Sequence, residues 1–172
     1  MYIKKIENFD IEGLLLITID NFYDDRGEIW TLHSNNDIFP NFVEDKITIS
    51  KHGVLRGLHG DRDTHKLISC LEGSFILNVV DARTDSKTYG KSEKFELTNN
   101  GQLVLVPAGC LNGHLCTSEK CIFWYKWSEK YDLSKQVTVM WNDSELNLDW
   151  GTKRPILSER DKCGEKFKGV RL

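Results

Sequence analysis

The stretch Ser74-Phe-Ile-Leu-Asn-Val-Val-Asp-Ala82 predicts a β-strand with two apolar faces. Side chains alternate between the faces of a strand, so residues two apart share a face. One face carries Phe75, Leu77 and Val79, and the other carries Ile76 and Val80. A strand that is apolar on both faces needs a covering layer on each side. We therefore expect residues 74–82 to form a central strand of a layered β structure.

The rest of the chain repeats short apolar stretches separated by Gly, Asn and Asp, which is the pattern of an all-β protein. Strands are predicted at 14–20, 28–33, 46–50, 66–71, 74–82, 92–98, 102–107, 121–127 and 136–141. Helical periodicity is weak, and only short helical turns are expected near 37–42 and 144–148. No repeat or linker divides the chain. The sequence predicts one domain over residues 1–172, an all-β jelly-roll sandwich or barrel.

Composition excludes several classes of partner. The 172 residues include 23 Lys+Arg and 26 Asp+Glu, for a net charge of −3. The charges are interspersed, so there is no basic stripe for nucleic acid and no polybasic segment for a membrane surface. The longest apolar run, residues 13–19, is far below the roughly 20 residues of a membrane span, and the first residues lack a signal-peptide core. We expect a cytoplasmic protein that binds neither nucleic acid nor membrane.

Cysteine and histidine spacing argues against disulfides and metal sites. The five cysteines are odd in number and lack CxxC spacing, which favours reduced, mostly buried thiols. A metal-binding β-barrel of this kind uses two His separated by one residue, a Glu, and a third His after a Pro-x-Gly turn. His59 and His65 are too far apart for the first pair, and Asn112 stands at the third position. We expect no metal and no cofactor.

Two stretches carry residues suited to chemistry. Gly53-Val-Leu-Arg-Gly-Leu-His-Gly60 places Arg56 and His59 three residues apart between glycines, where backbone can approach a ligand closely. Alternation in residues 123–127 puts Phe123, Tyr125 and Trp127 on one face, which should line a cavity or an interface. Alone, each stretch has a plainer interpretation, because a single His on a β protein is more often a surface residue.

Taken together, ordered blocks of sequence resemble the dTDP-4-dehydrorhamnose 3,5-epimerase family. The blocks are 25–27, 53–59, 66–67, 80–83, 88–90, 106–109, 125–126, 147–150 and 155–161. Their shared order over most of the chain is more specific than any single motif. The resemblance implies a cupin jelly roll, a homodimer, and cofactor-free epimerisation of a nucleotide-linked 4-keto sugar.

The residue types suit this isomerase chemistry. A 4-keto group acidifies the C–H bonds at C3 and C5, so inversion needs a base on one face of the ring, an acid on the other, and a cation at the ketone oxygen. The resemblance implies that His59 is the base, Asp161 its orienting carboxylate, Lys66 the cation, Tyr125 the acid, and Arg26 and Arg56 the pyrophosphate ligands. Tyr131 is the alternative acid.

Departures from the family pattern favour a particular subgroup, the GDP-4-keto-heptose epimerases of bacterial capsular polysaccharide biosynthesis. Gly60 is interpreted as leaving room for added sugar carbons, and Asp61 as binding added hydroxyl groups. Asn112 and His114 follow the Pro-x-Gly turn as substrate-binding residues. Glu44 and Lys46 stand where the family holds thymine, and a carboxylate at Glu44 or Asp45 suits the donors of guanine.

Two alternatives stay open. One is the ordinary dTDP-4-dehydrorhamnose 3,5-epimerase, which acts on dTDP-4-keto-6-deoxyglucose. The other is a non-catalytic jelly roll that only binds sugar nucleotides. The second is disfavoured because binding alone would not require the full set of His59, Lys66, Tyr125 and Asp161.

Overall fold

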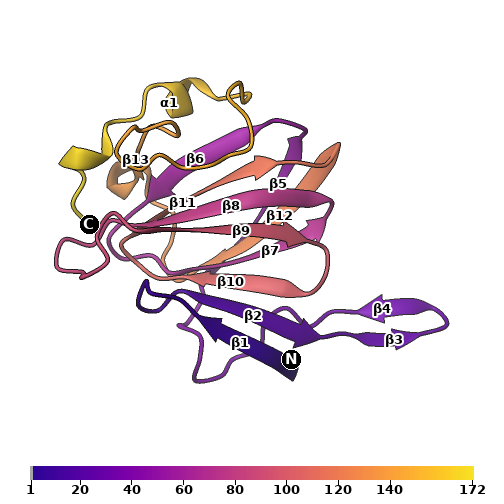
Figure 1. Cartoon of the computed structure of the whole chain (residues 1–172). Helices are drawn as coiled ribbons and strands as arrows, with labels where there is room; N and C mark the ends of the chain where they lie inside the picture. The colour runs from indigo at the N-terminus through magenta and orange to yellow at the C-terminus, as the bar shows by residue number, and fades with distance from the viewer. Residues whose placement is uncertain (1) are drawn as a thin grey trace.

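Two antiparallel sheets pack face to face in the computed structural model, which describes residues 2–172 (Figure 1). One sheet has the order β1 (Tyr2–Asn8), β2 (Leu15–Asp20), β10 (Gln102–Val106), β7 (Lys66–Glu72), β12 (Lys120–Trp127) and β5 (Glu44–Lys51). The other has the order β13 (Val137–Thr138), β6 (Leu55–Gly60), β11 (Cys110–Cys116), β8 (Ser74–Asp81) and β9 (Ser92–Thr98). The predicted all-β class and jelly-roll architecture are confirmed.

Strand β8 occupies the interior position that its sequence predicts. It pairs with β11 on one side and β9 on the other, and Phe75–Asp81 are buried. Phe75, Leu77 and Val79 join the core between the two sheets. Ile76 and Val80 join a second core on the outer face, where the C-terminal part of the chain supplies Trp150, Phe167 and Val170. In Figure 1 this part, in yellow, covers β6 and β11, so the five-stranded sheet is buried on both faces.

Four predicted elements differ in the structure. Predicted strand 28–33 is only β4 (Gly27–Ile29), the partner of β3 (Phe22–Asp24), and 136–141 contains only the two residues of β13. The turns at 37–42 and 144–148 are not helical. The helical segments are instead η1 (Leu133–Lys135), α1 (Glu159–Lys162) and η2 (Phe167–Gly169). No helix within residues 2–172 is long and apolar enough to cross a lipid bilayer.

Strands β6 and β11 were not predicted because polar side chains interrupt their apolar alternation. They pair closely at Gly57 and Gly113, where a Cβ on Gly57 would lie 2.4 Å from the Gly113 Cα. Gly57 also has a φ of 130°, which favours glycine. The glycine spacing in residues 53–60 therefore serves the close approach of two strands.

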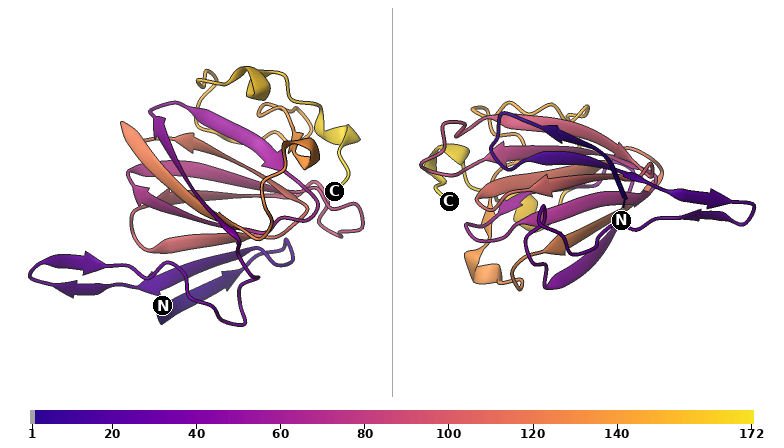
Figure 2. Two further views of the ribbon diagram at one scale, coloured as in Figure 1. Left: turned by 180° about the vertical axis from the view of Figure 1, so that it is seen from behind. Right: turned by 90° about the horizontal axis from the view of Figure 1, so that it is seen from below.

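The β3–β4 hairpin projects away from the sandwich (Figure 2). The chain then returns through residues 30–43, which cover part of the outer face of the six-stranded sheet with Trp30, Leu32, Phe39 and Phe42. All five cysteine thiols are free, and four are buried, as the sequence predicts.

A buried carboxylate supports the turn after β8. Asp81 is fully buried, and its oxygens accept hydrogen bonds from Arg83 Nε at 2.9 Å, Ser86 Oγ at 2.5 Å and Thr88 Oγ1 at 2.6 Å. Burial would raise the pKa of Asp81, but these donors outweigh it and lower the pKa to about 2. Asp81→Ala leaves the donors without their shared acceptor, so we expect a loss of roughly 3–5 kcal/mol in the free energy of unfolding. Urea denaturation measures it, and a loss below about 1 kcal/mol would contradict this role.

Candidate active site

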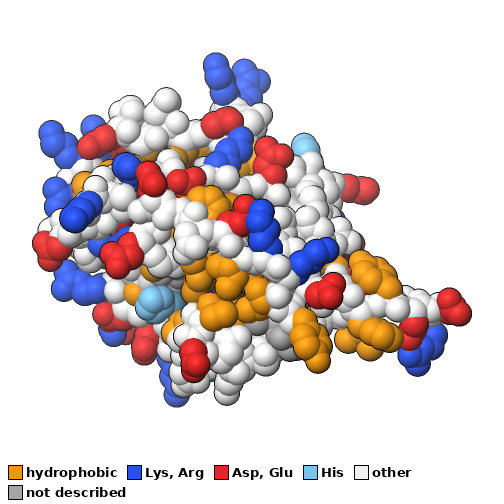
Figure 3. Space-filling model, turned by 60° about the horizontal axis from the view of Figure 1, so that its bottom comes forward, with side chains coloured by type: hydrophobic (Ala, Val, Ile, Leu, Met, Phe, Trp, Pro, Cys, Tyr) orange, Lys and Arg blue, Asp and Glu red, His pale blue; other side chains and the backbone are white. Residues whose placement is uncertain are grey.

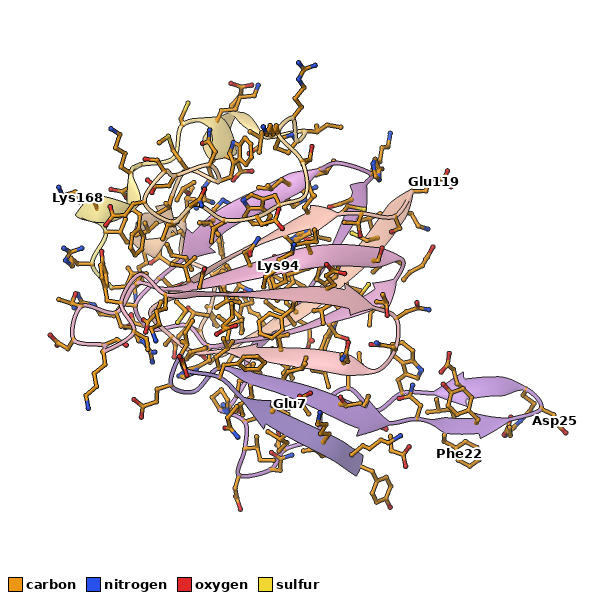
Figure 4. All side chains as sticks on the ribbon, in the orientation of Figure 1. Glu7, Phe22, Asp25, Lys94, Glu119 and Lys168 are labelled. Atoms are coloured by element: carbon orange, nitrogen blue, oxygen red, sulfur yellow. The ribbon has the colours of Figure 1, made fainter. Side chains whose placement is uncertain are left out.

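A cavity of about 400 Å³ opens between the two sheets, among the side chains drawn between them in Figure 4. Phe123, Tyr125 and Trp127 line it from β12, so the face predicted from their alternation does border a cavity. The other lining residues are Lys46, Thr48, Arg56, His59, Lys66, Asn112, His114, Tyr131, Gln136, Ser158, Arg160 and Asp161. Residues distant in sequence therefore meet here.

His59 and Asp161 form a hydrogen-bonded pair on the wall of this cavity. His59 Nε2 lies 2.6 Å from Asp161 Oδ1. The position of Asp161 is set by helix α1, whose N-cap Ser158 accepts from the Asp161 backbone N–H and donates its hydroxyl to Asp161 Oδ2 at 2.7 Å. The Ser-x-x-Asp spacing is a local signal for such a helix start. Asp161 is 3% exposed, so a buried carboxylate holds the His59 ring in place.

The electrostatics of the pair favour a neutral imidazole. Burial lowers the pKa of His59 below its usual value of 6.5, and the hydrogen bond to Asp161 only partly opposes this. For Asp161, burial acts to raise the pKa, but the bonds from His59 and Ser158 prevail and lower it. With Nε2–H donated to the carboxylate, Nδ1 is the unprotonated nitrogen of His59. It can accept a proton at neutral pH.

Lys66 is a buried cation beside this pair. Its Nζ donates to Asn112 Oδ1 at 2.7 Å and to the carbonyl oxygen of His59 at 3.3 Å. It also lies 5.0 Å from the centroid of the Trp127 ring. Burial lowers its pKa to about 8. An ammonium group has three N–H donors, so one is left for an oxygen atom of a ligand.

Tyr125 faces the cavity from the other sheet. His59 lies on β6 of the five-stranded sheet and Tyr125 on β12 of the six-stranded sheet, and both line the cavity. Burial raises the pKa of Tyr125, so its hydroxyl keeps its proton at neutral pH. A flat ligand between the sheets would therefore meet a base on one face and a hydroxyl donor on the other.

Arg56, Asn112 and His114 also line the cavity. Arg56 Nε donates to Ser50 Oγ at 3.2 Å. His114 stacks on Phe123 with centroids 4.1 Å apart, and burial, with the nearby Arg56, lowers its pKa to about 3. His114 is therefore neutral and forms part of an aromatic wall.

Arg26 lies outside the cavity. It is at the tip of the β3–β4 hairpin, its side chain is 84% exposed, and its guanidinium pairs with Asp24 at 2.5 Å. Glu44 does not line the cavity; it pairs with the lining residue Lys46 at 2.6 Å and accepts from the Tyr131 backbone N–H at 3.2 Å. Lys46 itself lines the cavity, over the rings of Trp127 and Tyr131.

Gly60 and Asp61 do not have the roles expected from the sequence. A Cβ on Gly60 would lie 2.5 Å from the backbone oxygen of Cys110, so this glycine permits packing against β11 and leaves no room for a ligand. Asp61 is 3% exposed and outside the lining of the cavity. Its carboxylate accepts from the backbone N–H groups of Asp63 and Thr64 and from the Gln136 amide. Asp61 therefore stabilises the turn after β6.

Sequence reasoning missed the cation Arg160. It lines the cavity from α1, and its Nε donates to Thr138 Oγ1 at 2.7 Å. Its only local signal is its place between Ser158 and Asp161, within a block chosen for other residues. No three His, Cys, Asp or Glu side chains within residues 2–172 gather in a way that could hold a metal ion.

Comparisons with known proteins agree on one family. The family model for dTDP-4-dehydrorhamnose 3,5-epimerase matches residues 8–169. The enzyme of this name from Shigella flexneri is 33% identical over 73% of this chain and 72% of its own length. The enzyme from Pseudomonas aeruginosa is 31% identical over 95% of this chain and 96% of its own length. The crystal structure of the enzyme from Elizabethkingia anophelis has a TM-score of 0.91 at 33% identity, covering both chains completely. A Legionella pneumophila epimerase in complex with dTDP-4-keto-L-rhamnose has a TM-score of 0.89 at 28% identity, covering 96% of this chain and 94% of that one.

Proposed function

Because the chain belongs to the dTDP-4-dehydrorhamnose 3,5-epimerase family, we propose that it inverts C3, C5 or both in a nucleotide-linked 4-keto sugar bound in the cavity. One observation carries this proposal: His59, which is paired with Asp161 of α1, and Tyr125 line the cavity from opposite sheets. Lys66 supplies a buried cation in the same cavity. The activity is that of an isomerase.

The reaction runs through an enolate. His59 Nδ1 removes a proton from the carbon next to the ketone, and the electron pair of that C–H bond moves toward the ketone oxygen, where the free N–H of Lys66 stabilises the negative charge. Tyr125 then donates its proton to the same carbon from the opposite face. Solvent removes the proton from His59 and restores that of Tyr125, so the substrate and product have the same atoms.

The preferred substrate is a dTDP-linked 4-keto-6-deoxyhexose. The relatives named above are dTDP-4-dehydrorhamnose 3,5-epimerases, and the Legionella enzyme is bound to a dTDP-4-keto sugar. Gly60 and Asp61 no longer argue for a GDP-4-keto-heptose. Gly60 provides no space for added sugar carbons, and the Asp61 carboxylate is bonded to its own turn. The GDP sugar stays a second candidate through Glu44, a carboxylate paired with the cavity residue Lys46, because a carboxylate can accept from the donors of guanine.

Direct incubation tests the choice of substrate. The purified protein is given dTDP-4-keto-6-deoxyglucose or GDP-4-keto-heptose, and the products are identified by NMR after reduction of the ketone. We expect inverted product from the dTDP sugar at a far higher kcat/KM. Preference for the GDP sugar would reverse the assignment, and no turnover of either, with tight nucleotide binding retained, would favour a non-catalytic binding protein.

A homodimer is part of the proposal. Phe22, Tyr23 and Ile29 on the hairpin and Ile47 and Ile49 on β5 are all at least 59% exposed, and Figure 3 shows apolar side chains on and beside the hairpin. Exposed apolar side chains of this size mark interaction surfaces, and the hairpin and β5 offer two of them. In a dimer formed through these surfaces, Arg26 could contact the cavity of the partner subunit. Sedimentation equilibrium should give twice the chain mass for the wild type, and the chain mass for Ile47→Lys/Ile49→Lys; a monomeric wild type would contradict the dimer.

The mechanism predicts a bell-shaped dependence of kcat/KM on pH. His59 acts when neutral, so the rate rises with pH through its pKa, which burial places below 6.5. Lys66 acts when protonated, so the rate falls as pH rises through its pKa of about 8. The Tyr125 pKa is raised and contributes only at higher pH. Initial rates across both limbs check this, with Lys66→Met expected to be slow and to lack the alkaline limb near 8. A wild-type rate that stays constant through that limb would contradict the role of Lys66.

A further inference from the structure

Asn112 contacts the catalytic cation directly. Its side-chain oxygen accepts the 2.7 Å hydrogen bond from Lys66 Nζ, and the two side chains are 9% and 3% exposed. We infer that Asn112 is a positioning residue of the epimerisation, whose uncharged amide oxygen holds Lys66 toward the ketone without neutralising its charge. This inference rests on the proposed function and replaces the substrate-binding role expected of Asn112 from sequence.

The positions of the strands explain how Asn112 orients the ammonium group. Asn112 on β11 is the register partner of His59 on β6, whereas Lys66 begins β7 in the opposite sheet. Two of the three Lys66 N–H groups are therefore directed to acceptors on the five-stranded sheet, Asn112 Oδ1 and the His59 carbonyl oxygen. Tetrahedral geometry directs the third away from both. Since Lys66 lines the cavity, that N–H is the one available to the ketone oxygen.

The absence of charge on the amide matters for catalysis. Negative charge appears on the ketone oxygen only as the C–H bond breaks, so an ammonium with no anionic partner stabilises the transition state more than the ground state. A carboxylate at position 112 would form an ion pair with Lys66 and compete with the enolate for its charge. The other titratable groups that face Lys66 are His59, Asp61, Cys110, Lys46 and Arg160. Asp61 is the only carboxylate among them, and its charge raises the pKa of Lys66 through space, but its oxygens accept hydrogen bonds from its own turn and from Gln136 rather than from Lys66.

Two substitutions of Asn112 should shift the pKa of Lys66 in opposite directions. Asn112→Asp keeps the shape of the side chain but adds a negative charge, which raises the pKa of Lys66 from about 8 and moves the alkaline limb of kcat/KM to higher pH. The plateau kcat should fall by roughly tenfold or more with a smaller change in KM. Asn112→Ala removes an acceptor that favours the charged form, so the pKa of Lys66 and the alkaline limb should both move lower. A role in packing alone predicts no such pair of opposite shifts.

The matched control is Asn78→Asp. Asn78 is 2% exposed on β8, directly opposite Gly113 of β11, but its side chain donates to the Asp149 backbone oxygen and does not line the cavity. This variant places the same buried charge in a neighbouring strand. It should lose stability while leaving the titration of Lys66 and the alkaline limb in place.

Two readouts decide the inference. NMR titration of ¹³C-labelled lysine, with the Lys66 signal assigned from its loss in Lys66→Arg, follows the pKa in the free protein, and the pH profile of kcat/KM follows its consequence. We expect both to shift upward in Asn112→Asp and downward in Asn112→Ala. If Asn112→Asp does not fold, the downward shift in Asn112→Ala decides alone.

An unchanged Lys66 titration in the folded variants would overturn the inference, and so would a shifted titration with an unchanged pH profile of kcat/KM. Absence of turnover in the wild-type protein would instead overturn the proposed function. The two failures are distinguishable, because the NMR titration needs no substrate.

Discussion

His59→Ala is expected to abolish deuterium exchange at both C3 and C5 of the 4-keto sugar. Every turnover begins with removal of a proton from carbon, and His59 is the cavity histidine that a carboxylate, Asp161, orients so that its other ring nitrogen can accept that proton. Loss of a positioned general base costs on the order of 10²–10⁴-fold in rate. The measurement is the rate of deuterium incorporation from D₂O, followed by NMR. Exchange does not require inversion, so its rate reports the action of the base alone.

His52→Ala is the matched control for this experiment. His52 is exposed, lies within hydrogen-bond distance of the Thr117 carbonyl oxygen, and does not line the cavity. Its removal should leave the exchange rate unchanged. Circular dichroism establishes that both variants are folded. Near-normal exchange in folded His59→Ala would assign the base to another residue and contradict the mechanism.

Tyr125→Phe is expected to uncouple exchange from inversion. The change removes the hydroxyl that would protonate the opposite face, so inversion should fall by roughly 10²-fold or more. His59 can still remove a proton and return a solvent-derived one on its own face, and deuterium exchange should continue. The ratio of exchange to epimer formation should therefore rise sharply relative to the wild type. The aromatic contacts of Tyr125 with Phe123 and Trp127 do not require the hydroxyl and should persist.

Tyr131→Phe separates this role from that of the second tyrosine on the cavity. Tyr131 is 44% exposed, and its hydroxyl lies 3.4 Å from Arg160 Nη1. Its variant should keep the wild-type ratio of exchange to inversion. Equal loss of both rates in Tyr125→Phe would remove the acid role from Tyr125. Uncoupling in Tyr131→Phe instead would transfer that role to Tyr131.

The sequence predicts the architecture where packing alone determines it. The two-sided apolar pattern of residues 74–82 places β8 correctly, because a strand buried on both faces requires two cores. The sequence does not predict strands β6 and β11, because polar residues that line the cavity interrupt their apolar alternation. These residues are Arg56, His59, Asn112 and His114. Periodicity therefore fails at two of the strands that line the site, although it does predict β7 and β12, which carry Lys66 and Tyr125.

The sequence likewise predicts some of the site residues and misinterprets others. The ordered blocks identify His59, Lys66, Tyr125 and Asp161, which the structure brings to one cavity. The interpretation of Gly60 and Asp61 does not hold, because a small residue next to a site residue can serve backbone packing, and a carboxylate can be used up by its own turn. Which neighbour an amide such as Asn112 contacts depends on the register of β11 with β6 and on the sheet opposite. One-dimensional spacing does not contain that information.

Deuterium incorporation by the wild-type protein tests the central claim most directly. The protein is incubated in D₂O with dTDP-4-keto-6-deoxyglucose, and NMR follows deuterium at each ring carbon together with the configuration of the product. The enolate mechanism predicts deuterium at C3, C5 or both, next to the ketone and nowhere else, together with inversion at a labelled carbon. Inversion without incorporation of deuterium, or no exchange at either carbon with any 4-keto sugar nucleotide, would contradict it.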